Sequence, residues 1–130
     1  MNFKEIKTSG SDLNFVFGTG DKPYLKAKND AYTAIGAFIF RGTDILGTPS
    51  NIKILARLKE VATIDMDVRI YDATNANVIC EVTGITDLIT TLYDLGVISN
   101  LPTGEANFEI QAKVGLNNKE GWVISMGVQF

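Results

Sequence analysis

The sequence contains no histidine and only one cysteine, Cys80. Histidine is the commonest general base and a frequent metal ligand, so its absence removes the usual proton acceptor of serine and cysteine nucleophiles. One cysteine cannot form an internal disulfide, and its place in an apolar run predicts a small buried side chain. We therefore expect a protein that is not an enzyme, with no catalytic residues, no cofactor and no metal.

Long hydrophobic runs are also missing. No stretch of about 18 uncharged apolar residues, the length needed to span a bilayer, occurs anywhere, and the N-terminus MNFKEIKTSG has no apolar segment of signal-peptide length. We expect a protein made in the cytoplasm that has no membrane partner and does not follow the usual secretory route.

Clustered positive charge is the third absence. The formal net charge is −3, and the stretch from Ile70 to Ala112 carries acids but no lysine or arginine. Nucleic-acid affinity comes mainly from grouped lysines and arginines, so such a surface would repel a phosphate backbone. We expect no nucleic-acid partner.

The chain of 130 residues, 45% of them hydrophobic, is long enough for one domain with a real core. Its dominant pattern is alternation with a period of two, which places one face of a strand on a core. The predicted inward sets are Ile52, Ile54, Ala56 and Leu58; Ile64, Met66, Val68 and Ile70; Phe108, Ile110, Ala112 and Val114; and Trp122, Ile124, Met126, Val128 and Phe130.

Shorter or less regular β-forming segments lie at 13–18, 24–28, 34–42, 78–82 and 88–98. Together these segments make about eight strands separated by turn residues, which is typical of an antiparallel sandwich. We predict an all-β, two-sheet antiparallel sandwich of jelly-roll-like type. Residues 31–130 would form its core, and residues 1–30 either an N-terminal arm or a first hairpin.

Two groups of acids are candidate sites. The cluster Asp72–Asn77 carries oxygen ligands suited to calcium, but the spacing of a calcium loop is absent, and Asp and Asn are common in turns. We interpret it as a turn. Asp65 and Asp67 could form a glycosidase pair, yet alternating acids on a strand are more typical of its solvated side.

Aromatic residues offer candidate contacts. The segment Ala37–Phe40 has apolar residues on both faces of the expected strand, which fits either a subunit interface or burial on both sides within one subunit. Tyr71 falls on the polar face of its strand. We take Phe38, Phe40 and Tyr71 as candidate partner contacts. We assign Trp122 to the core because it falls on the same face of its strand as Ile124 and Met126.

Two stretches carry a resemblance to a known family. RIYDATNANVICEVTGI and LGVISNLPTGEANFEIQAKV resemble a pattern of small β-sandwich structural proteins of tailed bacteriophages, of the capsid decoration (cement) or fibre-module type. The layout is a strand ending in I-Y-D-x-T-N, a tight turn into V-I-x-E, and later an L-P-x-G-E turn into a strand. The resemblance covers roughly residues 34–130.

That resemblance implies a viral structural protein, most simply a decoration protein that stabilises a capsid as a homotrimer. Its partner would be the major capsid protein or another virion protein, and its location the virion after synthesis in the host cytoplasm. The alternative is a carbohydrate- or receptor-binding module of a fibre or tail, which would use an exposed Tyr71, Tyr93 or Trp122.

Overall fold

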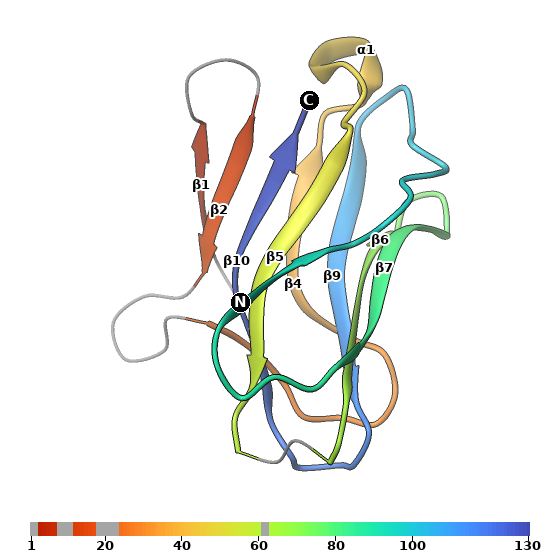
Figure 1. Cartoon of the computed structure of the whole chain (residues 1–130). Helices are drawn as coiled ribbons and strands as arrows, with labels where there is room; N and C mark the ends of the chain where they lie inside the picture. Colours follow the sequence, from red (N-terminus) through yellow and green to blue (C-terminus); the bar gives the residue numbers. More distant parts are fainter. Residues whose placement is uncertain (1–2, 8–11, 18–23, 61–62) are drawn as a thin grey trace.

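A computed structural model describes residues 3–7, 12–17, 24–60 and 63–130 (Figure 1). Their backbone forms ten strands and one short helix. In chain order these are β1 (Phe3–Lys7), β2 (Leu13–Phe17), β3 (Leu25–Ala27), β4 (Thr33–Phe40), α1 (Thr43–Leu46), β5 (Asn51–Leu58), β6 (Met66–Asp72), β7 (Asn77–Ile85), β8 (Thr91–Asp94), β9 (Ala106–Val114) and β10 (Gly121–Gln129).

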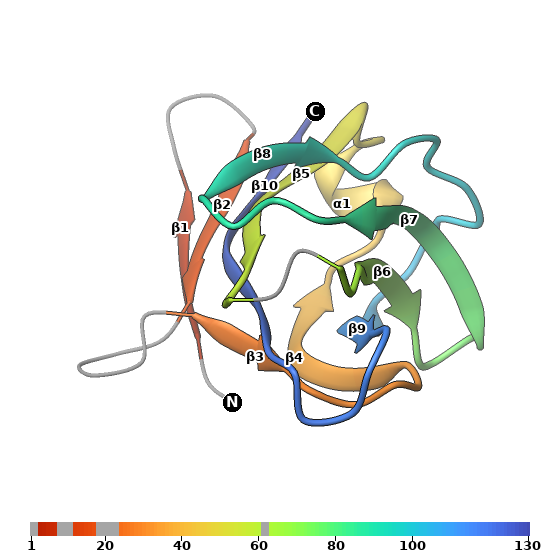
Figure 2. The same ribbon diagram turned by 60° about the horizontal axis from the view of Figure 1, so that its bottom comes forward.

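The strands form two antiparallel sheets that face each other (Figures 1 and 2). One sheet has the order β1-β2-β10-β5-β8, with β3 also paired to β10; the other has the order β4-β9-β6-β7. If β2 and β3 are counted as one interrupted strand and β1 as an addition, this is the strand order of a jelly roll. The predicted all-β sandwich is confirmed.

Alternation identified the core-facing side of three strands correctly. The predicted inward residues of β5, β6 and β9 are all buried, with Ile64 beside them as the most exposed at 9%. The two sheets pack through these residues, and Phe108 lies between Phe38 and Phe40 from β4, at centroid distances of 5.7 and 4.8 Å. Period-two alternation was decisive because each of these strands has one buried and one solvated face.

The prediction for β10 was wrong in its first half. Trp122 and Ile124 are only half-buried, whereas Val123 is buried. The register against β5 shifts between Val123 and Ser125, so Ile124 is the extra residue of a β-bulge. A bulge exchanges the two faces of a strand, which is why Met126 and Val128 face the core as predicted but Trp122 does not.

The strands before residue 30 belong to the six-stranded sheet. β2 pairs with β10 at residues 125–128 and β3 pairs with β10 at residues 121–123, so the two follow one another along the same neighbour. Leu13, Phe15 and Phe17 lie in the core. Residue 30 therefore marks no boundary in the pairing of the described strands. The segment GTGDKP, residues 18–23, whose residue types favour a turn between the predicted strands 13–18 and 24–28, lies outside the described residues.

Candidate functional site

The polar cluster after β6 is a turn. Asp72 is fully buried, and its carboxylate accepts hydrogen bonds from the backbone N–H groups of Thr74 and Asn75, at 2.9 and 3.0 Å, and from the side-chain amide of Asn75 at 2.7 Å. An aspartate that binds the backbone two and three residues ahead is a common turn device. Both carboxylate oxygens are occupied by this turn, and the prediction of a turn at 72–77 is confirmed.

The two stretches that carry the family resemblance lie together at one end of the sandwich. The backbone N–H of Ala73 donates to the carbonyl of Asn107 at 2.9 Å, and the N–H of Asn107 donates to Oγ1 of Thr74 at 2.8 Å. Nearby, the carbonyls of Pro102 and Thr103 accept hydrogen bonds from the first N–H groups of α1, both at 3.1 Å. Contacts within the chain therefore use much of the polar chemistry of these motifs.

The predicted partner contacts lie in three different environments. Phe40 is in the core, 3% exposed and stacked on Phe108, and Phe38 is half-buried, 4.8 Å from the ring of Phe15. Between them Ile39 is 53% exposed. In this chain Phe40 has almost no surface to offer, so the exposed large apolar side chain of the segment is Ile39. A partner role for Phe38, Phe40 and Tyr71 stays a prediction.

Tyr71 lies on the outer face of the four-stranded sheet, beside a cluster centred on Arg69. The guanidinium of Arg69 lies 3.9 Å from the ring centroid of Tyr32 and 5.2 Å from that of Tyr71, and its Nε donates to Gln111 at 2.7 Å. Burial, together with the negative charge of Asp67, raises the pKa of Tyr32 to about 12. On this outer face the Arg69 cation is therefore held against two aromatic rings, those of Tyr32 and Tyr71.

Trp122 lies on the outer face of the other sheet. Its ring stacks on Tyr24 at 4.3 Å, the guanidinium of Arg57 lies 5.0 Å from its centroid, and its Nε1 donates to Glu120 at 3.2 Å. Burial acts to raise the pKa of Glu120, but this hydrogen bond and the charge of Lys59 outweigh it, and the pKa is lowered. Trp122 is thus a surface aromatic held by neighbours on both sides of β10.

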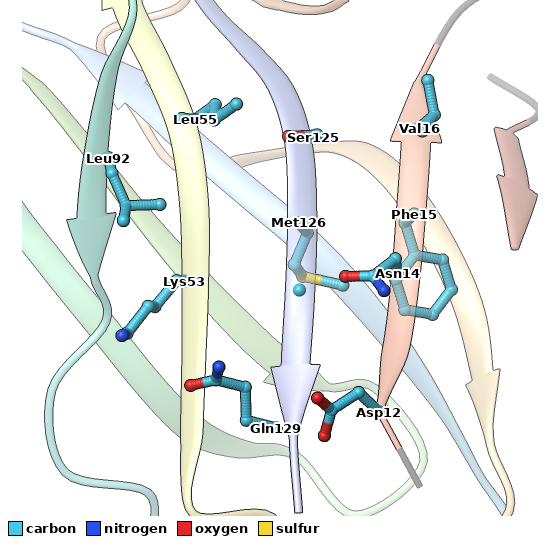
Figure 3. Close-up of a pocket in the computed structure, with 11 residues that line it drawn as sticks. Asp12, Asn14, Phe15, Val16, Lys53, Leu55, Leu92, Ser125, Met126 and Gln129 are labelled. Carbon is cyan, nitrogen blue, oxygen red and sulfur yellow. The ribbon is translucent and has the colours of Figure 1, made fainter. Parts of the chain in front are cut away.

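The outer six-stranded face carries a groove of about 440 Å³ that crosses its strands (Figure 3). Its middle row runs perpendicular to the strands, since Ser125 is the register partner of Val16 and of Leu55, and Leu55 that of Leu92. Val16 and Leu92 are 50% and 59% exposed. Because Ser125 and Gly127 are small, the groove is hollow over β10, between the larger side chains of Val16 on β2 and Leu55 on β5.

One end of the groove is polar. Asn14, Lys53 and Gln129 line it together with Asp12, whose carboxylate also accepts a hydrogen bond from the N–H of Phe130. The remaining lining is apolar or small, and the groove is open along the sheet (Figure 3). An open trough with one acid, one base and an apolar row is suited to a segment of polypeptide rather than to a small molecule, which prefers an enclosed cavity.

Sequence reasoning missed this groove because its lining comes from four strands that are far apart in the chain. Val16 and Leu92 are ordinary outward positions when each strand is read alone. The signal that could have been used is the pair of small residues in β10, since small side chains at the middle of a sheet leave a depression between larger neighbours.

Cys80 and the acids offer no competing centre among the described residues. Burial raises the pKa of the Cys80 thiol to about 12, so the thiol stays protonated at neutral pH. No group of three or more Asp, Glu, Cys or His side chains with metal-binding geometry occurs in the part of the chain that is described. In the same part, no helix is long and apolar enough to cross a membrane.

Comparison with known proteins gives a likeness in fold. No protein-family model matches the sequence, and no curated protein matches it. Among solved structures, the fold is similar to the VP2 subviral particle of infectious bursal disease virus, with a TM-score of 0.51, 11% sequence identity and 90% of this chain covered. The two chains share a fold.

The matched part is a fraction of the larger protein. This chain spans 32% of the length of the VP2 chain. At 11% identity the likeness concerns the β-sandwich fold alone. The tailed-phage family itself gains no support from it.

Proposed function

We propose that this chain is a non-enzymatic structural protein of a virion, a capsid decoration protein that stabilises the shell through protein–protein contacts. The observation that carries the proposal is the β-sandwich fold of this chain, which is similar to that of a chain from a viral subviral particle. The location would be the virion, the partner the major capsid protein, and the working form the homotrimer that the family resemblance implies. The absence of histidine is in keeping with a role without acid–base chemistry.

The internal bonding of the chain supports a rigid building block. No buried side-chain nitrogen or oxygen among the described residues lacks a hydrogen-bond partner. The loops at the end of the sandwich near Asp72 are hydrogen-bonded to one another, as described above. A protein that reinforces a shell needs such a rigid body, because flexible contacts would lose entropy on binding.

The groove supplies a surface for docking. We assign it to an extended segment of the major capsid protein, with an apolar side chain between Val16 and Leu92 and an acidic or carbonyl group at Lys53. Exposed apolar rows with a polar rim are typical of protein-binding surfaces.

A sedimentation assay tests the proposal. The purified protein is mixed with shells of the virus that encodes it, prepared without it, and the pelleted fraction and the melting temperature of the shells are measured. We expect co-sedimentation and a higher melting temperature. Leu92→Lys should weaken binding about tenfold or more, whereas Val97→Lys, a matched change at a residue that is 88% exposed outside the groove, should bind normally. If the wild-type protein stays in the supernatant at every concentration, the decoration role is wrong.

A carbohydrate- or receptor-binding module is the second candidate, favoured by the surface position of Trp122. Its stack with Tyr24 gives an aromatic surface of the kind that binds sugars. Glycan-array binding that is lost in Trp122→Ala, or in Tyr71→Ala on the opposite outer face, would favour this candidate. Binding to shells that is unchanged in these two variants would favour the decoration role.

A further inference from the structure

The free edges of the two sheets are protected to very different degrees. The edge of β7 is covered, because the N–H of Glu81 donates to Leu95 and the N–H of Ser99 donates to Ile79, at 3.0 and 2.9 Å. The edge strand β8 has four residues, and β1 has the charged sequence FKEIK. By contrast β4 is eight residues long, TAIGAFIF, with neither a charge nor a proline. Short, charged or covered edges resist pairing with other chains, whereas long uncharged edges favour it.

The hydrogen bonds of β9 show which backbone groups of β4 face outward. The N–H and carbonyl of Asn107 bond to Thr74 and Ala73, on the β6 side, while the N–H of Val114 donates to Asn29, on the β4 side. Backbone groups alternate along a strand, so Glu109 also bonds toward β6. Asn107 and Glu109 are the register partners of Ile39 and Ala37.

It follows that the N–H and carbonyl groups of Ala37 and Ile39 point away from β9. The sheet order ends at β4, so no described strand pairs with β4 on that side. Four backbone hydrogen-bonding groups therefore line this part of the edge, spaced as one strand would need to pair with another. The side chain of Ile39, 53% exposed, stands beside them.

We propose that this edge binds β4 of a second copy of the chain, antiparallel across a two-fold axis near Phe38. In this register Ala37 of each copy lies opposite Ile39 of the other, and the two residues of each pair exchange two hydrogen bonds. The two four-stranded sheets join into one continuous sheet.

Three properties make the second copy the fitting occupant. The strand is uncharged from Thr33 to Phe40, so pairing it with itself places no like charges together. The small Ala37 opposite the large Ile39 lets the outward side chains pack without overlap. A two-fold axis uses the same patch on both subunits, so the patch of each copy is occupied by the other and growth into fibres stops. The inference does not depend on the proposed function, since it concerns the purified chain alone.

Sedimentation velocity on the full chain over a range of concentrations tests the pairing. We expect an even-numbered species: a dimer, or a hexamer if a separate three-fold contact also forms. Ile39→Lys should halve the mass of the assembled species at a given concentration. The dissociation constant should rise on the order of 100-fold, because the substitution removes two apolar contacts across the two-fold axis and brings two charges together. Val97→Lys is the matched control and should leave the mass unchanged.

Ala37→Pro provides a second variant. Proline is tolerated on an edge strand where its missing N–H faces away from the sheet, so the β4–β9 pairing is kept while one outward donor is lost. Melting curves verify that both variants fold. A wild-type protein that is monomeric at about 100 μM would overturn the proposal. So would an even-numbered assembly of the wild type that Ile39→Lys and Ala37→Pro both retain.

Discussion

Asp72→Ala is the substitution that best tests how the chain holds its loops together. Asp72 is fully buried, and three hydrogen bonds converge on its carboxylate from Thr74 and Asn75. A hydrogen bond to a charged group contributes about 1.5–3 kcal/mol, but such contributions are not additive. Both donor residues are exposed, so water can replace the carboxylate once it is removed. We therefore expect the free energy of unfolding to fall by about 2–4 kcal/mol.

Urea unfolding followed by tryptophan fluorescence measures this loss. The slope of the transition should be unchanged, because the substitution alters stability and not the surface exposed on unfolding. Asp72→Asn retains an oxygen for the two backbone donors and loses only the acceptor for the Asn75 amide, so it should cost about half as much. Asp44→Ala, at an exposed position in α1, is the control and should stay within about 0.5 kcal/mol of the wild type.

A loss below about 0.5 kcal/mol in Asp72→Ala would refute the reasoning, because it would mean that the turn forms without its buried carboxylate. A large loss in Asp72→Ala with an equal loss in Asp72→Asn would show that the negative charge matters more than the count of hydrogen bonds. Either result can be read from the same set of unfolding curves.

Three further outcomes are expected. Cys80 should resist alkylation by iodoacetamide at pH 8 in the folded protein and react rapidly in urea, because burial raises its pKa to about 12; equal rates by mass spectrometry would contradict this. The pKa of Tyr32 is raised from 10.0 to about 12. The contribution of Tyr32 to stability is therefore complete below pH 10 and lost as the pH rises toward 12. Thermal melts of Tyr32→Phe should lack this pH dependence. Gly121→Ala places a Cβ where the buried Met66 sulfur lies, so it should lower the unfolding free energy by about 1–3 kcal/mol, and an unchanged melting temperature would show that Met66 repacks freely.

How far sequence reasoning succeeds here depends on how regular each strand is. In β5 and β6 the two faces alternate without interruption, and in β9 the alternation is broken only at the buried Gln111, so the predicted inward residues of all three strands are buried. In β10 one inserted residue exchanges the faces, which moved Trp122 from the predicted core to the surface. A bulge depends on the pairing of two strands, so the pattern of one strand cannot reveal it.

The polar turn and the candidate site show the same division. Asp72–Asn77 could be identified as a turn because its residue types favour turns locally. The groove between Val16 and Leu92 could not be identified, because its lining residues become neighbours only through the order β2-β10-β5-β8. Similarly, α1 has four residues and is held by carbonyls of Pro102 and Thr103, so no periodic pattern marked it in advance.

The sequence by itself determined that this is an all-β sandwich with one buried face on most strands, because period-two alternation reports burial directly. It also determined the chemistry that is absent, since a chain without histidine has no imidazole to offer anywhere. Only the tertiary structure decided which outward side chains meet across strands and which strand edges are left unpaired. The physical reason is that pairing between distant segments depends on the whole set of strands competing for partners, and no local pattern contains that information.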